Sequence, residues 1–268
     1  RIPFVLSFIG GDVFDPSKGI SPHRHGILRV AIRLISKFAV RSTAISSDTK
    51  SRVVNIHGVT SPITITPIGL VSREYDAKDR DVLGLPAGLL AVSIGRLIPR
   101  KGFETLLEAW KAVPDASLAI IGTGPLKSKL TAMIEEFGLS DRVFLLGSVS
   151  NERKHQVLKE ADLYVSAAQH EGFGIVFLEA MKAGLPIVAP VVGGQTDFLR
   201  NKENALLVDS LSSDDIASAV TALVGDSAMR DEMGKRNLRD VDSYSIKQTT
   251  AIFESVLTEA ITDYENRN

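Results

Sequence analysis

Short apolar segments alternate with longer amphipathic segments along almost the whole chain. The apolar segments are rich in Val, Ile and Leu, which is typical of buried strands. They are expected at Phe4–Phe8, Thr43–Ser46, Ile63–Thr66, Leu89–Ile94, Leu118–Ile121, Val143–Leu146, Leu163–Ser166, Pro186–Ala189 and Ala205–Val208. Helical spacing of apolar positions lies between many of them, for example at Phe103–Lys111, Leu126–Phe137, Glu152–Glu160 and Asp214–Val224. This alternation predicts an α/β fold with parallel sheets covered by helices on both faces.

A polar segment between Pro67 and Gly88 interrupts the alternation. Six expected strands follow it, enough for a complete Rossmann-like unit, whereas only three precede it. We therefore expect residues 1–70 to form part of one unit, 71–88 a linker, 89–243 a second unit, and 244–268 a long amphipathic helix. The chain begins at Arg1 rather than Met and enters a strand-like segment at once, so we expect that an upstream part of the first unit is missing.

The composition excludes several classes of protein. With 268 residues and 44% hydrophobic content, the chain is typical of a soluble globular protein. The absence of cysteine excludes disulfides and thiolate chemistry, and the five histidines show no metal-ligand spacing. No apolar run approaches the roughly 20 residues of a membrane span, and no signal peptide is evident. We expect no nucleic-acid partner.

Charge is spread unevenly along the chain. Residues 1–60 carry nine Lys or Arg and three acids, a net charge of +6, which leaves −7 for the remainder. This asymmetry predicts an anionic partner for the first segment. Arg29, Arg33 and Lys37 recur every four residues on a predicted basic helix over residues 26–41. That helix either packs on the sheet with a solvated basic face or lies on an anionic membrane surface, and both interpretations remain open.

Two carboxylates lie eight residues apart across a glycine-rich turn, in Glu171-Gly172-Phe173-Gly174-Ile175-Val176-Phe177-Leu178-Glu179. Backbone N–H groups at glycines ahead of a helix can bind an anion, whereas the carboxylates themselves suit hydroxyl groups. Because apolar residues surround Glu179, its helix is predicted to be buried, and a buried carboxylate needs hydrogen-bond partners. The alternative is that Glu171 only complements a helix dipole and Glu179 faces solvent.

Basic residues that suit phosphate follow the strand expected at Leu89–Ile94, in Gly95-Arg96-Leu97-Ile98-Pro99-Arg100-Lys101-Gly102. Arg96 offers a planar fork for phosphate oxygens and Lys101 a compact charge. Arg100 is expected to be solvated, and the whole segment is alternatively an ordinary solvated loop. This loop and the Glu171 loop both follow parallel strands, so they are expected at the same edge of the sheet, where ligands bind.

Three further features have less specific explanations. Gly122-Thr123-Gly124-Pro125 is similar to a phosphate loop, but Lys127 occupies the position of the third glycine, so a tight strand-to-helix turn is favoured. His170 could transfer a proton, although a structural or hydrogen-bonding role is the more frequent one for a single histidine beside a strand end. Trp110 shares a predicted helix with leucines and is expected in the core.

Taken in order, these segments resemble the donor half of the retaining nucleotide-sugar glycosyltransferases of family 4, which have two Rossmann-like domains in the GT-B architecture. The resemblance covers nearly all of the chain and is strongest from Leu89 to Val208. Beyond the loops already described, it rests on Ile121–Pro125, Val143–Gly147 and Gly184-Leu185-Pro186-Ile187-Val188-Ala189. It implies one complete donor domain, part of a second Rossmann-like acceptor domain, and a C-terminal helix that crosses back to the acceptor domain.

The resemblance also implies roles for the candidate residues. Arg96 and Lys101 would bind the diphosphate and stabilise charge on the leaving group. Glu179 would accept hydrogen bonds from the ribose hydroxyls, and Glu171 would hold a hydroxyl of the donor sugar. The catalytic residues implied are Glu171, Arg96 and Lys101, and the donor-binding set adds Gly95, Gly147, Gly172, Phe173, Gly174, Ile175 and Glu179. The nucleoside diphosphate sugar is the donor substrate, and neither a metal ion nor a cofactor is implied.

On the acceptor side, Gly10-Gly11-Asp12-Val13 resembles the family's His-Gly-x-Asp loop, with Ile9 where His is usual. Gly11 and Asp12 are therefore candidate acceptor residues. Asp197 stands where Glu often follows the Gly193-Gly194 pair. The implied function is retaining, metal-independent transfer of a hexosyl-type sugar to a glycan or lipid-linked acceptor. We expect the protein in the cytoplasm, and the basic helix over residues 26–41 predicts a peripheral contact with the cytoplasmic membrane face as one of its two interpretations. The alternatives are a nucleotide-sugar-binding module without transferase activity and, more distantly, a sugar-nucleotide epimerase.

Overall fold

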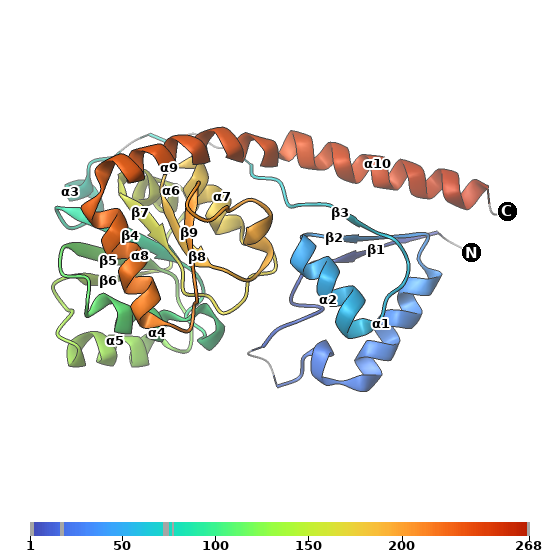
Figure 1. Cartoon of the computed structure of the whole chain (residues 1–268), viewed down its shortest axis with the longest axis horizontal. Coiled ribbons are helices and arrows are strands. Elements are labelled where there is room, and N and C mark those ends of the chain that lie inside the picture. The colour runs from blue at the N-terminus through green and yellow to red at the C-terminus, as the bar shows by residue number, and fades with distance from the viewer. Residues whose placement is uncertain (1–2, 17–18, 72–74, 77, 267–268) are drawn as a thin grey trace.

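The chain forms two parallel β-sheets with helices around them, as Figure 1 shows for the computed structural model. The structure describes residues 3–16, 19–71, 75–76 and 78–266. Residues 72–74 and 77 of the expected linker, and the extreme ends of the expected first unit and C-terminal helix, lie outside the described residues. The predicted α/β fold with parallel sheets is confirmed, and each of the nine expected strands is present within two residues of its predicted bounds.

The smaller sheet has three parallel strands in the order β1-β2-β3. Its elements are β1 (Val5–Phe8), η1 (Pro22–Arg24), α1 (Gly26–Phe38), β2 (Arg41–Ala44), α2 (Ser47–His57) and β3 (Ile63–Ile65). The side chain of Ser46 accepts a hydrogen bond from the Thr49 amide at the start of α2, and Gly58 ends that helix in the left-handed conformation. These are ordinary start and stop signals of a helix. They fix where α2 begins, at the edge that faces the larger sheet.

The larger sheet has six parallel strands in the order β6-β5-β4-β7-β8-β9. Its strands are β4 (Leu89–Ile94), β5 (Ala116–Ile121), β6 (Val143–Gly147), β7 (Leu163–Val165), β8 (Ile187–Pro190) and β9 (Ala205–Val208). Its helices are α3 (Arg80–Leu83), η2 (Pro99–Lys101), α4 (Phe103–Trp110), α5 (Lys127–Glu136), α6 (Asn151–Glu160), α7 (Ile175–Lys182), η3 (Gly194–Asp197), α8 (Ser213–Gly225), α9 (Ser227–Asp240) and η4 (Val241–Tyr244). Strand order reverses between β4 and β7, and the carboxyl ends of these two strands lead into the basic loop and the Glu171 loop.

Apolar side chains cover both faces of the larger sheet. One cluster joins the sheet to α4, α5 and α8, and Trp110 is fully buried within it and donates its indole N–H to the Ala116 carbonyl at 3.0 Å. The other cluster joins the opposite face to α6 and α7, with Phe177 and Leu178 fully buried. The predicted core position of Trp110 is therefore confirmed, and both faces of the sheet are covered as expected for parallel strands.

The long C-terminal helix α10 (Ile246–Glu265) runs from the larger unit along the smaller one (Figure 1). Leu70 pairs with Ser245 at its start, and Arg41 of β2 contacts Glu259 at 2.5 Å and Asp263 at 2.8 Å near its end. The expected long helix is thus confirmed, and it contacts the smaller sheet's unit. Among the described residues, no helix is both long enough and apolar enough to span a membrane.

Candidate functional site

The loop after β7 and the loop after β4 meet through an ion pair. The ammonium of Lys101 contacts Glu171 Oε1, and the two side chains are only 13% and 10% exposed. Gly95 allows this approach, because a Cβ at that position would lie 3.3 Å from the Lys101 side chain. The structure therefore brings together a cation and a carboxylate that lie 70 residues apart in the sequence.

Arg100 takes part in the same site, and the expectation that it is solvated is wrong. Its side chain is 18% exposed and donates to the His170 carbonyl at 3.1 Å. It also lies 3.9 Å from Glu171 Oε2 and 3.7 Å from Asp15 Oδ2 of the smaller unit. Arg96, in contrast, is exposed and lines neither of the two cavities described below.

A cavity of about 270 Å³ lies between the two units. From the larger unit, Lys101, Glu171 and the turn leading into α7 line it. The smaller unit contributes, among others, Ile9, Gly11, Phe14, Asp15 and Ile45. Asp12 does not line the cavity, because its carboxylate accepts the Ile9 backbone N–H at 3.1 Å and closes the local turn. Of the two acceptor-side candidates, Gly11 alone faces this space.

The glycine turn sets the position of the α7 N-terminus. Gly174 has a φ of +86°, and a Cβ there would lie 2.5 Å from the Phe177 ring, so only glycine fits without displacement. Immediately after it, α7 begins at Ile175, which lines both the cavity between the units and a second cavity. A helix N-terminus carries unpaired N–H groups and partial positive charge, so this end of α7 suits an anion.

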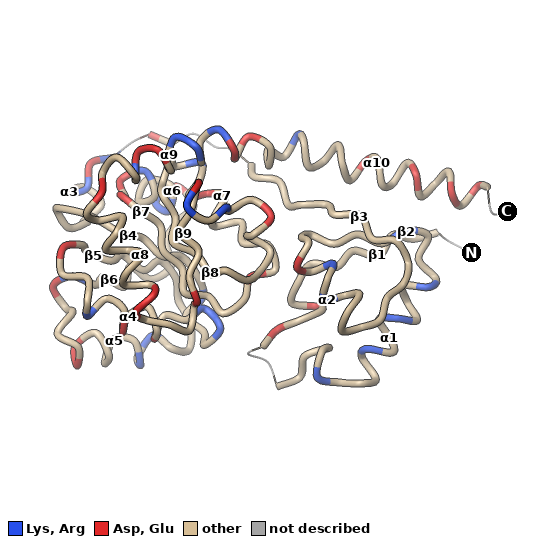
Figure 2. Tube along the Cα trace, viewed as in Figure 1, with Lys and Arg blue, Asp and Glu red and all other residues tan. Residues whose placement is uncertain are grey.

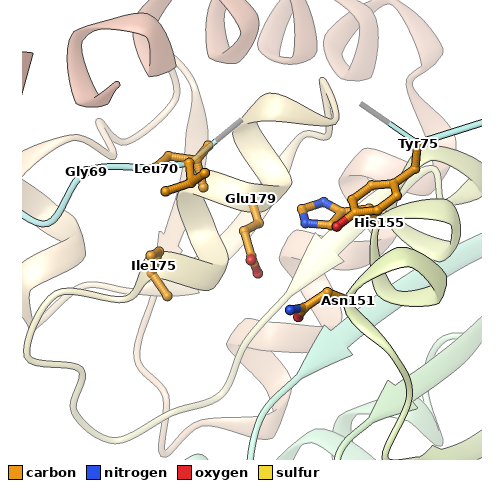
Figure 3. Close-up of a pocket in the computed structure, with 8 residues that line it drawn as sticks. Gly69, Leu70, Tyr75, Asn151, His155, Ile175 and Glu179 are labelled. Atoms are coloured by element: carbon orange, nitrogen blue, oxygen red, sulfur yellow. The ribbon is translucent and has the colours of Figure 1, made fainter. Parts of the chain in front are cut away.

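The second cavity, of about 250 Å³, contains Glu179 (Figure 3). Its other lining residues are Gly69, Leu70, Val71, Tyr75, Asn151, His155 and Ile175. The expectation that Glu179 is buried is confirmed, with 8% of the residue exposed. The rings of Tyr75 and His155 stack with their centroids 5.2 Å apart, and burial lowers the pKa of His155. Glu171 and Glu179 therefore lie on either side of the α7 N-terminus.

Lys154 of α6 is a further residue of this cavity region that the sequence did not reveal. Its ammonium lies 2.5 Å from Glu179 Oε1. Gly147, an expected donor-binding residue, ends β6 with a φ of +69° and accepts the Gly122 N–H at 2.8 Å, but it lines neither cavity. Asn151, four residues later, does line the Glu179 cavity. Within the described residues, no group of three or more His, Asp or Glu is placed to hold a metal ion.

Several hydrogen bonds join the start of α2 to the loops of the larger unit. His170 Nε2 lies 2.8 Å from Asp48 Oδ2, and Ser46 Oγ donates to the Gly172 carbonyl at 2.7 Å. Asp197 accepts the Ser47 N–H at 2.8 Å, which gives this departure from the usual Glu a structural role. His170 is 4% exposed and lies edge-on to Phe14, with ring centroids 4.9 Å apart. These contacts hold the walls of the inter-unit cavity together.

The contact between Asp48 and His170 leads to a prediction about how stability depends on pH. Burial alone would raise the pKa of Asp48, but hydrogen bonds from His170 and Arg52 and the charges of both groups outweigh it, so the pKa lies below its ordinary value of 3.8. A lowered folded-state pKa stabilises the protein above pH 3.8, and this contribution is lost as the pH falls through the folded-state pKa. We expect Asp48→Asn to lower the free energy of unfolding by about 1.5 kcal/mol at neutral pH.

Urea unfolding of both proteins at neutral pH and at about pH 3.5 measures this difference, which should shrink at the lower pH. The exposed Asp115 provides the control, since Asp115→Asn should change stability little at either pH. A destabilisation by Asp48→Asn that stays constant across this range would contradict the assigned cause.

Comparison with known proteins places this chain in a family. The family model described as "Glycosyl transferases group 1" matches residues 77–240. The lipopolysaccharide core biosynthesis glycosyltransferase LpsE of Rhizobium meliloti is 34% identical over 161 residues, which make up 60% of this chain and 47% of that protein. The GDP-mannose-dependent alpha-(1-6)-phosphatidylinositol monomannoside mannosyltransferase of Mycobacterium tuberculosis is 31% identical over 219 residues, 75% of this chain and 56% of that protein. The chain thus spans about half the length of the curated relatives it matches.

Solved structures share the fold. The crystal structure of Anabaena Alr3699/HepE in complex with UDP superposes with a TM-score of 0.82 at 22% identity, over 96% of this chain and 72% of that one. Sucrose-phosphate synthase from Thermosynechococcus elongatus gives a TM-score of 0.85 at 21% identity, over 96% of this chain and 68% of that one. At 22% and 21% identity, the similarity to these structures shows the fold alone. That fold has two Rossmann-like units with parallel sheets. Because the family model matches more than half of its residues, the chain belongs to the glycosyl transferases group 1, the family 4 of retaining nucleotide-sugar glycosyltransferases with the GT-B fold.

Proposed function

We propose that this protein transfers a hexosyl-type sugar from a nucleoside diphosphate sugar to a glycan or lipid-linked acceptor, with retention of configuration and without a metal ion. The observation that carries the proposal is the position of the two glutamates. Glu171, paired with Lys101, and Glu179 flank the N-terminus of α7 in two cavities that share Ile175. A sugar, a diphosphate and a ribose are linked in that order, and a carboxylate, a helix N-terminus and a second carboxylate follow in the same order here.

The diphosphate, the sugar and the ribose of the donor then each have a binding partner. The diphosphate binds the backbone N–H groups of Phe173, Gly174 and Ile175 and the charge of Lys101, which also stabilises the leaving group. Arg96, exposed on the same loop as Lys101, reaches the diphosphate when the donor is bound. Glu171 holds a hydroxyl of the transferred sugar, and Glu179 holds the ribose.

The acceptor binds from the smaller unit. We propose the division already expected from the sequence, with residues 1–70 on the acceptor side, 71–88 as linker, 89–243 as the donor domain and 244–268 as the returning helix. Gly11 and Ile9 line the cavity opposite Glu171, so an acceptor hydroxyl there would face the donor sugar. The names of relatives, for lipopolysaccharide core biosynthesis and for mannosyl transfer to a phosphatidylinositol monomannoside, support a glycan or lipid-linked acceptor.

A thermal-shift screen against UDP, GDP, ADP, TDP and their sugars tests the proposal, since a ligand that binds the folded state raises its stability by mass action. We expect at least one nucleotide to raise the melting temperature, and its sugar conjugate to be turned over with release of the nucleoside diphosphate. Binding without turnover would favour the alternative, a nucleotide-sugar-binding module without transferase activity. No stabilisation by any member of the panel would contradict both.

We also propose a cytoplasmic location with a peripheral contact between α1 and an anionic membrane surface. The helix carries Arg29, Arg33 and Lys37 and no acid (Figure 2), and Ile27 and Phe38 are 86% and 66% exposed. Cationic and exposed apolar side chains on one helix suit the interface of an anionic bilayer. Arg33 contributes less, because it also donates to the His57 carbonyl at 3.0 Å.

Vesicle sedimentation tests this contact. We expect the protein to sediment with vesicles that contain phosphatidylglycerol more than with neutral vesicles, and the double variant Arg29→Glu/Lys37→Glu to lose that difference. Binding that is equal on both kinds of vesicle, or unchanged in the variant, would remove the proposal.

A further inference from the structure

Lys154 lies in the first turn of α6 but turns inward. It is the fourth residue of the helix, its side chain is 17% exposed, and its ammonium lies 2.5 Å from Glu179 Oε1 on α7. The first turn of a helix favours anions, because the N-terminus carries partial positive charge. A desolvated cation at this position therefore does not stabilise α6 itself. Its evident effect is on Glu179.

The two oxygens of Glu179 differ in their surroundings. Oε1 accepts from Lys154, whereas Oε2 is buried and has no hydrogen-bond partner among the residues that the structure describes. Leaving a buried carboxylate oxygen without a donor is costly. Glu179 lines the second cavity, and Figure 3 shows its carboxylate directed into the space towards Asn151 and His155. The missing donor is therefore expected from a ligand in that cavity.

We propose that Lys154 is a positioning residue for the nucleoside: it occupies Glu179 Oε1 and fixes the carboxylate so that Oε2 meets the paired hydroxyls of a ribose. This inference rests on the proposed function and narrows it, because the donor is then a ribonucleoside diphosphate sugar rather than a 2′-deoxyribonucleoside one. One carboxylate oxygen has two acceptor sites, which two neighbouring hydroxyls can fill. A 2′-deoxyribose would leave one of these sites without a donor.

The choice of lysine suits this role. The ammonium donates to Oε1, and Oε2 is left without a donor among the described residues. Without Lys154, Glu179 would have two free oxygens and no fixed orientation, and either oxygen could meet a single hydroxyl. Removal of Lys154 is therefore expected to weaken ribose recognition specifically, not nucleotide binding as a whole.

Calorimetry with UDP, GDP, ADP and their 2′-deoxy counterparts tests the assignment on the full chain. We expect the unsubstituted protein to bind its preferred ribonucleoside diphosphate about tenfold more tightly than the 2′-deoxy form. In Lys154→Met this preference should fall to about twofold or less, mainly through weaker binding of the ribose form. The matched control is Lys129→Met, which breaks an exposed pair, 2.7 Å apart, between Lys129 of α5 and Glu104 of α4 and should keep the full preference.

A double-mutant cycle separates positioning from direct contact with the ligand. In a Glu179→Gln background, Lys154→Met should cause no further loss of preference, because its effect passes through Glu179. Lys154→Arg, which keeps the cation, should retain most of the preference, whereas Lys154→Ala should lose it and replaces the methionine variant if that one does not fold. Equal weakening of both nucleotide forms, or a loss that persists in the glutamine background, would overturn the assignment.

The outcomes also distinguish this inference from the function on which it rests. If the unsubstituted protein binds none of the six nucleotides and no member of the thermal-shift panel stabilises it, the proposed function fails and the inference fails with it. If it binds a nucleotide with no preference for ribose, or keeps its preference in Lys154→Met, the inference alone fails.

Discussion

Replacing Lys101 by methionine is expected to lower the rate of sugar transfer by about 100-fold, which corresponds to about 2.7 kcal/mol of transition-state stabilisation. Lys101 is the cation that contacts Glu171 in the cavity between the two units, and both side chains are nearly buried. Charge that develops on the leaving diphosphate in so little water is stabilised far more strongly by a fixed ammonium than it would be in solvent.

The measurement is the release of nucleoside diphosphate from the donor sugar that the thermal-shift panel identifies. An effect on the leaving group appears mainly in kcat, whereas a loss of ground-state binding appears in KM. Lys129→Met again provides the control, because it removes an exposed lysine that lines neither of the two cavities. A loss in kcat below about tenfold would argue against leaving-group stabilisation by Lys101.

Arg100 is a second cation beside Glu171 and affects how the Lys101→Met result is interpreted. It lies 3.9 Å from Glu171 Oε2 and remains after Lys101 is replaced. The guanidinium of Arg100 still neutralises Glu171 in this variant, so Lys101→Met should remain folded. The decrease in its transfer rate should therefore reflect catalysis and not unfolding. Arg100 is therefore better viewed as a support for Glu171 and Asp15 than as the solvated side chain that its sequence context indicates.

The strands could be predicted because buried parallel strands leave a continuous apolar signal. Leu89–Ile94 and Ala205–Val208, for example, have the predicted bounds. Helix α9 (Ser227–Asp240) is not among the predicted elements, since its sequence is largely polar and only Met233, Gly234 and Asn237 are buried. A helix of this kind is held by a few packed residues rather than by a clear apolar stripe, so periodicity does not reveal it.

The site could be predicted only in part. Glu171, Glu179 and Lys101 stand out because a charged residue beside glycines or in an apolar helix contradicts its local context. The partners of these residues do not stand out. Lys154 lies 25 residues from Glu179, and Asp48 lies 122 residues from His170. Such pairs arise from the packing of α6 on α7 and of α2 on the larger unit, and nothing local in one sequence encodes them.

Replacing Gly102 by alanine is expected to destabilise the protein strongly. Gly102 has a φ of +67° and separates Lys101 from the first residue of α4. A Cβ at this position would lie 1.9 Å from the Ala167 carbonyl oxygen, which belongs to the loop that leads to Glu171. Since that obstacle is backbone, it cannot be relieved by rotating a side chain, and the two loops that carry the ion pair would have to separate.

Gly138 offers a matched comparison, because it has almost the same conformation, φ +65°, and no described atom lies within 4 Å of the place that an added methyl group would take. Gly138→Ala carries only the cost of a left-handed non-glycine residue, about 1 kcal/mol. Gly102→Ala adds the steric overlap, so its free energy of unfolding should fall by about 3 kcal/mol or more, as measured by urea unfolding. An equal decrease in the free energy of unfolding of the two variants would mean that the loops after β4 and β7 separate at little cost. Their close contact would then not be what keeps Lys101 paired with Glu171.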